Sequence, residues 1–317
     1  MRVTGLMGDV AEATAPPLRR EDLLRVHPAV YLDRFESLSR AGGGEIGLRA
    51  PFGPGGYEIA ALSAGLVSHA LQTVLRGEAT NAYALSRPPG HHCLPDRPNG
   101  FCLLANIPLA IERARAAGLL RRVAVLDWDV HHGNGTEAIF LEDPDVLAIS
   151  IHQDRNYPLD TGAFAVRGAG DANLNVPLPP GSGHATYLEA MERIVVPALR
   201  RFEPEAIVVA CGLDAALPDP LGHMLATAET FDAMTAMVME AAAELCGGRL
   251  AMAHEGGYSE VYVPFCAHAV IARMAGSDRT APDPFADTFR RRQPGPAFER
   301  FASGVIAEMA EALAARS

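Results

Sequence analysis

The chain has 317 residues, of which 49% are hydrophobic and 21% charged, and its formal net charge at pH 7 is −11. This length is enough for one large buried core or two small ones. The acidic balance argues against nucleic acid or an anionic membrane surface as the main partner, whereas a cationic substrate would be tolerated. No sequence window approaches the length of an apolar membrane span, and no basic and apolar leader begins the chain, so we expect a cytoplasmic protein.

The pattern of apolar residues predicts alternating helices and strands along the chain. In order, we expect a helix at 57–76, a strand at 82–86, a helix at 104–117, strands at 123–128 and 146–151, a helix at 184–202, a strand at 206–211, a helix at 227–246, a strand at 250–254, and helices at 259–275 and 296–314. The strand segments are apolar on both faces, which is typical of a parallel sheet covered by helices on both sides. The sequence therefore predicts an α/β fold, and the absence of repeats or low-complexity linkers favours a single domain.

The cysteines are odd in number, scattered, and form no CxxC pair. They are Cys93, Cys102, Cys211, Cys246 and Cys266. This pattern favours buried thiols over a disulfide framework or a thiolate zinc site.

Unusual polar segments follow each predicted strand at its carboxyl end. They read "RPPGHH", "DVHHGNG", "HQDRNYPLDTG", "GLDAALPDPLG" and "EGGY". In open parallel sheets, ligands bind outside the carboxyl ends of the strands. We therefore expect these five segments to meet at one edge of the sheet and to form a site there.

The segment "LDWDVHHGNGT" predicts part of a metal site. On an extended backbone Asp127, Asp129 and His131 share one face. Asp129 and His131 offer an oxygen and a nitrogen ligand to zinc, and Asp214, which follows another strand, is the natural third ligand. A catalytic zinc site with three protein ligands keeps one position open for water. The alternative for these residues is a hydrogen-bonded turn with solvated charges.

The neighbours of these candidate ligands have other expected roles. Trp128 and Val130 point to the opposite face and are expected in the core. The same alternation turns His132 away from the metal. Asp127 fits better as a carboxylate that organises the surroundings of the metal than as a ligand.

The tandem His91 and His92 suit general acid and base chemistry near neutral pH, provided that each imidazole is oriented by a polar partner. Asp127 and Asn134 are candidate partners. An isolated histidine would more often be a satisfied core or surface residue, but this pair follows "RPPG" at the same sheet edge as the metal motif.

"HEGGY" places Tyr258 after two glycines. Its hydroxyl could donate a hydrogen bond to an oxyanion opposite the metal, with Gly256 and Gly257 leaving room for a substrate. The alternative is a loop tyrosine whose ring is simply packed.

Taken together and in this order, "RPPGHH", "NGFC", "LDWDVHHGNGT", "GLDAALPDPLG" and "EGGY" resemble the histone deacetylase superfamily. The similarity is greatest to the class II and bacterial histone deacetylase-like amidohydrolases, which include acetylpolyamine amidohydrolases. It implies the arginase–deacetylase fold and zinc-dependent hydrolysis of an acyl-lysine, an acetylpolyamine or another small N-acyl amide. The similarity covers 27–276 of the single domain 1–317 and leaves 277–317 as a C-terminal helical extension.

The resemblance also implies a role for each matching residue. Asp129, His131 and Asp214 would bind Zn²⁺, His92 would be the general base with His91 as its electrostatic partner, and Tyr258 would polarise the carbonyl. Asp127 and Asn134 would orient the two histidines. The acyl tunnel of the family would be lined by Gly100, Phe101, Tyr157, Leu221, Gly256 and Gly257. A structural K⁺ would lie near Asp127, Asp129, His131, Ser150 and Ile151, and a second one near Phe140, Asp143 and Val146.

Two segments depart from the family pattern. Family members usually have several tens of residues before the part that matches "RVTGLMGDV", so their first strand and its loop are expected to be missing and Met1 to lie close to the second strand. A more open site, or one completed in a homo-oligomer, would follow. In "PGGYEIA", Gly55 and Gly56 replace the region where class I enzymes place a substrate-clamping aspartate, which favours a small or flexible acyl amine.

Two alternative functions remain open from the sequence. A dinuclear manganese ureohydrolase shares the fold, but it needs further carboxylates where this chain has Gly133, Gly212 and Ala216. A non-catalytic protein that binds acyl groups or a partner could keep the fold without needing the paired histidines, Tyr258 or all three metal ligands.

Overall fold

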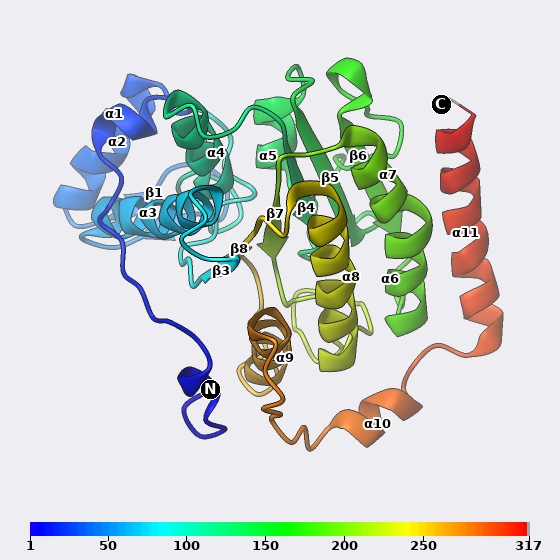
Figure 1. Cartoon of the computed structure of the whole chain (residues 1–317). Coiled ribbons are helices and arrows are strands. Elements are labelled where there is room, and N and C mark those ends of the chain that lie inside the picture. The colour runs from blue at the N-terminus through cyan, green and yellow to red at the C-terminus, as the bar shows by residue number, and fades with distance from the viewer. Residues whose placement is uncertain (316–317) are drawn as a thin grey trace.

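A parallel six-stranded sheet runs through the centre of the chain in the computed structural model, which describes residues 1–315 (Figure 1). The strand order is β3-β8-β7-β4-β5-β6. The strands are β3 (Asn81–Ala84), β4 (Val123–Asp127), β5 (Val146–Gln153), β6 (Asn173–Leu178), β7 (Ala206–Cys211) and β8 (Leu250–His254). A short antiparallel pair, β1 (Gly44–Glu45) and β2 (Pro51–Phe52), lies apart from this sheet. This is the predicted α/β architecture of one domain.

Helices cover both faces of the sheet. They are α1 (Arg20–Leu23), α2 (Ala29–Arg40), α3 (Gly56–Leu75), α4 (Asn106–Ala116), α5 (Asn134–Phe140), α6 (His184–Ala190), α7 (Val196–Phe202), α8 (Ala228–Cys246), α9 (Val263–Ala275), α10 (Ala286–Arg291) and α11 (Pro296–Ala314). Of these helices, α1 and α2 pack outside α3 and α4. In Figure 1, α6, α7 and α8 lie on the viewer's side of the sheet, with α5 behind it and α11 at the edge beyond α6.

The alternation of side chains along β4 shows how the two apolar layers arise. Ala124 and Leu126 are buried in the cluster formed with α6 to α9 and α11. Val123 and Val125 point the other way, into the cluster formed with α3, α4 and α5. Because successive strand residues face opposite sides, a strand covered on both faces must be apolar throughout.

Several elements are absent from the prediction, and β6 and α5 are the two of these that adjoin the predicted site. β6 reads "NLNVPL", in which Asn173, Asn175 and Pro177 resemble a polar loop. At this edge of the sheet both asparagine side chains donate hydrogen bonds to Glu137, at 2.8 and 2.7 Å, so the polar residues have buried partners. α5 begins among the glycines of the "HHGNGT" motif, and these hide its helical spacing.

The predicted helix at 184–202 is interrupted. The chain forms α6, then a π-helical turn at Met191–Val195, then α7. Pro197 lies at the start of α7 and has no backbone N–H to donate to the preceding turn, which accounts for the changed hydrogen-bond pattern. The predicted helix at 259–275 starts later, at Val263, because residues 259–262 form turns.

The first residues of the chain form no strand. Met1–Asp9 consists of turns around a short 3-10 helix at Leu6–Gly8, with Leu6 buried against α9 residues Ile271 and Ala272. One described helix, α3, is long and apolar enough to cross a membrane by length and composition, contrary to the expectation that no segment would be. It is packed against α4 and the sheet, and 61% of this segment is buried, as in a core helix.

The C-terminal residues pack on the domain. Phe289 of α10 and Ile306 and Met309 of α11 belong to the same buried cluster as α6 and α8. Arg316 and Ser317, which complete the predicted extension, lie outside the described residues.

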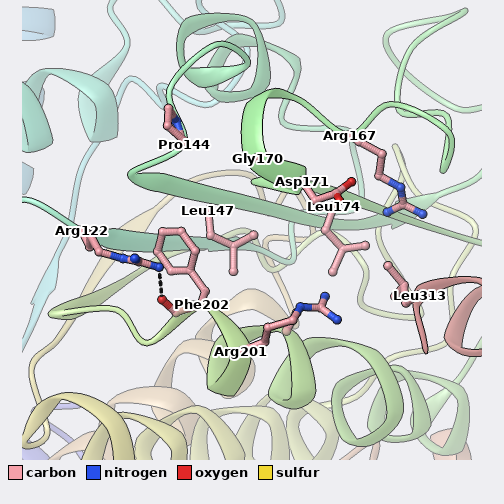
Figure 2. Close-up of a pocket in the computed structure, with 11 residues that line it drawn as sticks. Arg122, Pro144, Leu147, Arg167, Gly170, Asp171, Leu174, Arg201, Phe202 and Leu313 are labelled. Carbon is pink, nitrogen blue, oxygen red and sulfur yellow. Dashed lines mark hydrogen bonds between the residues drawn. The ribbon is translucent and has the colours of Figure 1, made fainter. Parts of the chain in front are cut away.

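A pocket of about 340 Å³ lies at the amino ends of β4, β5 and β6 (Figure 2). Arg122, Arg167 and Arg201 contribute to its wall, together with Asp171 and apolar residues such as Leu147. The Arg122 guanidinium donates a hydrogen bond to the carbonyl of Phe202 and lies over its ring. This pocket is at the opposite edge of the sheet from the predicted site.

Candidate metal and catalytic site

The five polar segments meet at the carboxyl edge of the sheet, as predicted. β3 leads to His91 and His92, β4 to Asp129 and His131, and β7 to Asp214. β5 and β8 lead to the segments of Tyr157 and Tyr258. Because the strands are parallel and adjacent, their carboxyl ends deliver these side chains to one place.

Asp129, His131 and Asp214 form a buried cluster with the geometry of a metal site. One ligand atom from each lies within 4.8 Å of the others. The Nδ1 atom of His131 lies 2.9 Å from Asp129 Oδ1 and 3.2 Å from Asp214 Oδ2. Asp214 Oδ2 is buried and accepts no hydrogen bond in the described structure, whereas Asp214 Oδ1 accepts one from the Val130 backbone at 2.8 Å. The cluster therefore presents one nitrogen and two oxygen donors to a common point.

The electrostatics of this cluster favour a bound cation. Burial and the charge of Asp129 raise the pKa of Asp214 to about 7, because two carboxylates share a buried site. Burial opposes the protonation of His131, but the carboxylates of Asp129 and Asp214 close to its Nδ1 atom outweigh this and raise its pKa to about 11. Two oxygen ligands and one imidazole nitrogen match the donor set of catalytic zinc sites. The residues present thus fit a zinc ion.

The backbone around the cluster differs from the extended strand that the sequence predicts. β4 ends at Asp127, and the following residues form bends. There, side-chain oxygens accept backbone hydrogen bonds in place of the carbonyls of a neighbouring strand. Asp127 Oδ1 accepts the backbone N–H of Asp129 at 3.0 Å, and Asp129 Oδ1 accepts that of His131 at 2.9 Å. Asp129 and His131 are brought together by these turns rather than by strand alternation.

The side chains beside the cluster lie as expected. Trp128 and Val130 are fully buried in the core. The ring of His132 points away from the metal cluster, with Nδ1 3.0 Å from Thr161 Oγ1 and Nε2 3.3 Å from Glu137 Oε2.

His91 and His92 lie against each other beside the cluster, with their rings tilted by 38° and the ring centroids 3.9 Å apart. His91 Nδ1 lies 2.9 Å from Asp127 Oδ2, and His92 Nδ1 lies 2.8 Å from Asn134 Oδ1. Since both partner oxygens accept hydrogen bonds, each Nδ1 is the donor and each Nε2 is left for other contacts.

The surroundings of the two imidazoles shift their pKa values in opposite directions. Burial lowers the pKa of His91, but the charges of Asp129 and Asp127 outweigh it and raise that pKa to about 10. Burial and the nearby positive charges of His91 and His131 hold the pKa of His92 well below its usual range. His92 is therefore neutral at pH 7 and can accept a proton at Nε2, while His91 carries the charge.

Tyr258 lies on the solvent-facing side of the cluster. Burial and the charges of Asp129 and Asp214 raise its pKa, so its hydroxyl stays protonated and remains a hydrogen-bond donor. Its backbone N–H donates to Asp219 Oδ2 at 2.7 Å, which fixes the loop.

Four side chains on this side are exposed or half-buried, and we call them the outer residues: Phe101, Tyr157, Leu221 and Tyr258. The Phe101 ring lies 5.8 Å from that of Tyr258, and the Tyr157 ring packs edge-on at 5.1 Å from His92. Gly100 is required here, because a Cβ atom would lie 2.4 Å from His92 Cδ2. The outer residues therefore lie between the buried histidines and the solvent.

The residues of the expected cation sites are placed as follows. Ser150 pairs with Asp127 in the register of β4 and β5, and Ile151 follows it. In the second expected group, the Asp143 N–H donates to Phe140 O at 2.9 Å and the Val146 N–H donates to Asp143 O at 3.3 Å.

Sequence reasoning missed Glu255, although it stands in the quoted "EGGY" motif. Its side chain is fully buried, and Oε2 accepts the backbone N–H groups of Gly90 at 2.7 Å and His91 at 3.1 Å. Burial raises its pKa to about 7. Glu255 therefore fixes the backbone that carries both histidines. A charged residue directly after a buried strand was the available signal.

A second group of potential ligands in residues 1–315 consists of His91, Cys102 and Glu255. Its members already have other partners, because His91 pairs with Asp127 and Glu255 accepts two backbone hydrogen bonds. The cysteines are all free and buried, as the sequence predicts.

A layered α/β domain with a buried Asp–His–Asp cluster beside two histidines is the arrangement of the arginase–deacetylase fold. The family model described as the histone deacetylase domain matches residues 1–274. The chain belongs to this family. The match includes all the residues described above that form the site.

The relatives include bacterial and plant proteins. A histone deacetylase-like amidohydrolase of Pseudomonas aeruginosa is 56% identical over 97% of this chain and 82% of its own length. Histone deacetylase 8 of Arabidopsis thaliana is 37% identical over 81% of this chain and 71% of its own length. The crystal structure of the HDA15 HD domain superposes with a TM-score of 0.79 at 31% identity, covering 95% of this chain and 86% of that one. These similarities support a deacetylase or amidohydrolase function.

Proposed function

We propose that the chain is a zinc-dependent hydrolase that removes an acyl group, such as acetyl, from an amine. The observation that carries the proposal is the buried Asp129, His131 and Asp214 cluster, whose Asp214 Oδ2 has no hydrogen-bond partner in the described structure, beside a neutral His92. Asp129, His131 and Asp214 would hold the ion. When bound, zinc would supply Lewis acidity to the amide carbonyl and lower the pKa of a water ligand.

The chain's own residues divide the proton transfers between them. His92 Nε2 would take a proton from the attacking water, because Asn134 fixes the tautomer with Nδ1–H. The charged His91, held by Asp127, would stabilise negative charge that develops beside it. The hydroxyl of the water adds to the acyl carbon, the C–N bond breaks, and the proton held by His92 passes to the leaving amine.

Tyr258 would stabilise the oxyanion that forms on the acyl oxygen. Its raised pKa keeps the hydroxyl proton in place for donation. Gly100, Gly256 and Gly257, together with the outer residues, would line the path of the substrate. The substrate would be an acyl-lysine, an acetylpolyamine or another small N-acyl amide.

A structural K⁺ would occupy the group around Asp127 and Ser150. The support for this site is their pairing at the buried end of β4 and β5, where Asp129, His131 and Ile151 would supply further oxygens. Hard cations of this kind take carboxylate, hydroxyl and carbonyl oxygens.

The test is hydrolysis of acetyl-lysine peptides, acetylpolyamines and small alkyl acetamides by zinc-loaded protein. Tyr258→Phe removes only the hydroxyl, and we expect kcat to fall by about 10²- to 10³-fold. Zinc content should not change, because Tyr258 is not a ligand. Turnover of every amide that is unaffected by Tyr258→Phe would contradict the proposed role, and no hydrolysis of any amide by wild-type protein would contradict the function.

A further inference from the structure

Two arginine side chains flank the outer residues. The guanidinium carbon of Arg49 lies 5.8 Å from the ring centroid of Tyr157, and that of Arg87 lies 5.9 Å from the centroid of Tyr258. The two are linked through Phe101, whose backbone N–H donates to Arg49 O at 2.8 Å and whose ring lies beside Tyr258. Both arginines are exposed. They therefore carry positive charge to the side from which a substrate arrives.

Neither of these charges is neutralised by an ion pair within residues 1–315. Many surface arginines of this acidic chain pair with carboxylates, as Arg200 does with Glu244 and Arg273 with Asp232. Arg49 and Arg87 form no such pair. The Nη1 atom of Arg87 instead donates to the carbonyl of Glu255 at 2.7 Å, which leaves its charge uncompensated.

Three carboxylates of the surrounding loops contact other groups than Arg49 and Arg87. Asp219 is buried and accepts the backbone N–H groups of Leu221, Tyr258 and Ser259. Glu45 Oε1 accepts the N–H of Ala50, at 3.2 Å. Asp154 lies 3.7 Å from the guanidinium of Arg155. Although the net charge of the chain is −11, the charged side chains that lie over the rings of the outer residues Tyr157 and Tyr258 are these two arginines.

We propose that, among N-acyl amides, the enzyme prefers those whose amine portion carries a carboxylate a few bonds from the scissile nitrogen over those that carry a cation. This inference rests on the proposed hydrolase function. An amine portion that extends outward past Phe101 and Tyr258 brings its end group within range of both guanidiniums. N-Acetylated polyamines, which the net charge of the chain alone would favour, become the disfavoured class.

The expected size of the preference is modest, because the arginines are exposed and interactions between exposed charges are weak. We expect kcat/KM for an anionic substrate to exceed that for a cationic one of equal length by about tenfold, which is about 1.4 kcal/mol. Salt should reduce this ratio, since the Debye length is only about 10 Å at 0.1 M ionic strength.

Three acetamides of similar length test the inference with zinc-loaded protein: 6-acetamidohexanoate, N-hexylacetamide and N-acetyl-1,5-diaminopentane. Arg49→Gln keeps much of the side-chain stem and removes the charge, so the ratio of anionic to cationic kcat/KM should fall by about threefold or more. Arg34→Gln is the matched control, because Arg34 is exposed on α2 and forms no ion pair within the described residues. This control should leave the ratio unchanged.

The outcomes separate the inference from the function on which it rests. Hydrolysis of N-hexylacetamide together with a rate for the cationic amide equal to or above that for the anionic amide would overturn the charge preference alone. A ratio that Arg49→Gln leaves unchanged would overturn the assignment to Arg49. Hydrolysis of none of the three would overturn the proposed function and the inference with it.

Discussion

The sharpest structural prediction concerns Gly256, which follows Glu255 beside the metal cluster. A Cβ atom at this position would lie 2.1 Å from Asp214 Oδ2 and 2.6 Å from Asp129 Oδ2, which are oxygens of two proposed ligands. The Gly256 backbone does not adopt a positive φ, so Gly256→Ala would act through this contact alone.

The expected loss of zinc affinity follows from the narrow range of distances that a metal site allows between the ion and its ligands. An ordinary contact between carbon and oxygen is about 3.4 Å, so at least one carboxylate must move by about 1 Å, whereas metal–ligand distances vary by only about 0.2 Å. We expect Gly256→Ala to weaken zinc binding by at least about 100-fold, the upper range for disturbed supporting residues. Overpacking should also cost about 1–3 kcal/mol of folding free energy.

The assay is a zinc titration against a competing chelator, with thermal unfolding measured in parallel. Gly304→Ala is the matched control, because Gly304 lies in α11 with no atom within 4 Å of the added Cβ. It should leave zinc affinity unchanged and stabilise the helix by up to about 1 kcal/mol. Wild-type zinc affinity in Gly256→Ala would refute the assignment of Asp129 and Asp214 as ligands.

Two further predictions concern stability. Burial lowers the pKa of His27 to about 4 from 6.5, so the unfolded chain binds a proton on His27 before the folded one does. Stability is therefore lost as pH falls from about 6.5 to about 4, by up to about 3 kcal/mol from this residue, and urea unfolding at pH 7 and 4.5 should show a smaller loss for His27→Gln. Glu255→Ala leaves the Gly90 and His91 N–H groups without their acceptor, so its unfolding free energy should fall by about 1–3 kcal/mol, and Glu255→Gln, which keeps an acceptor oxygen, should lose less.

For each of these two predictions, one result would contradict it. An equal loss of stability at low pH in wild-type protein and His27→Gln would show that the buried imidazole of His27 does not contribute to the pH dependence of stability. Equal stabilities of Glu255→Ala and wild type would show that the histidine segment does not depend on this carboxylate.

The sequence predicts the sheet and the location of the site because apolar runs and polar strand ends are local signals. The strand predicted at 123–128 begins with residues that are apolar on both faces, and the polar motif "DWDVHH" begins at its carboxyl end, at Asp127. The prediction fails where partners distant in sequence decide the structure. β6 depends on Glu137 to bury Asn173 and Asn175, and the turns that bring Asp129 beside His131 depend on side-chain acceptors in place of a strand ladder.

The charge at the site is also decided by partners that are distant in sequence. The net charge of the whole chain indicates tolerance of cations, but it does not reveal that Arg49 and Arg87 lie beside the rings of Tyr157 and Tyr258. These arginines come from loops that precede α3 and follow β3, and only the fold places them at one site. Local composition therefore predicts the reaction better than it predicts the substrate.

The most direct test of the proposed function is reconstitution of metal-free protein with zinc while amine release from an N-acetyl amide is followed. Hydrolysis should be absent without metal and should reach its maximum at one zinc ion per chain, and Asp214→Asn should neither bind this ion tightly nor hydrolyse the amide. Full hydrolysis by metal-free protein, or by Asp214→Asn, would contradict the account.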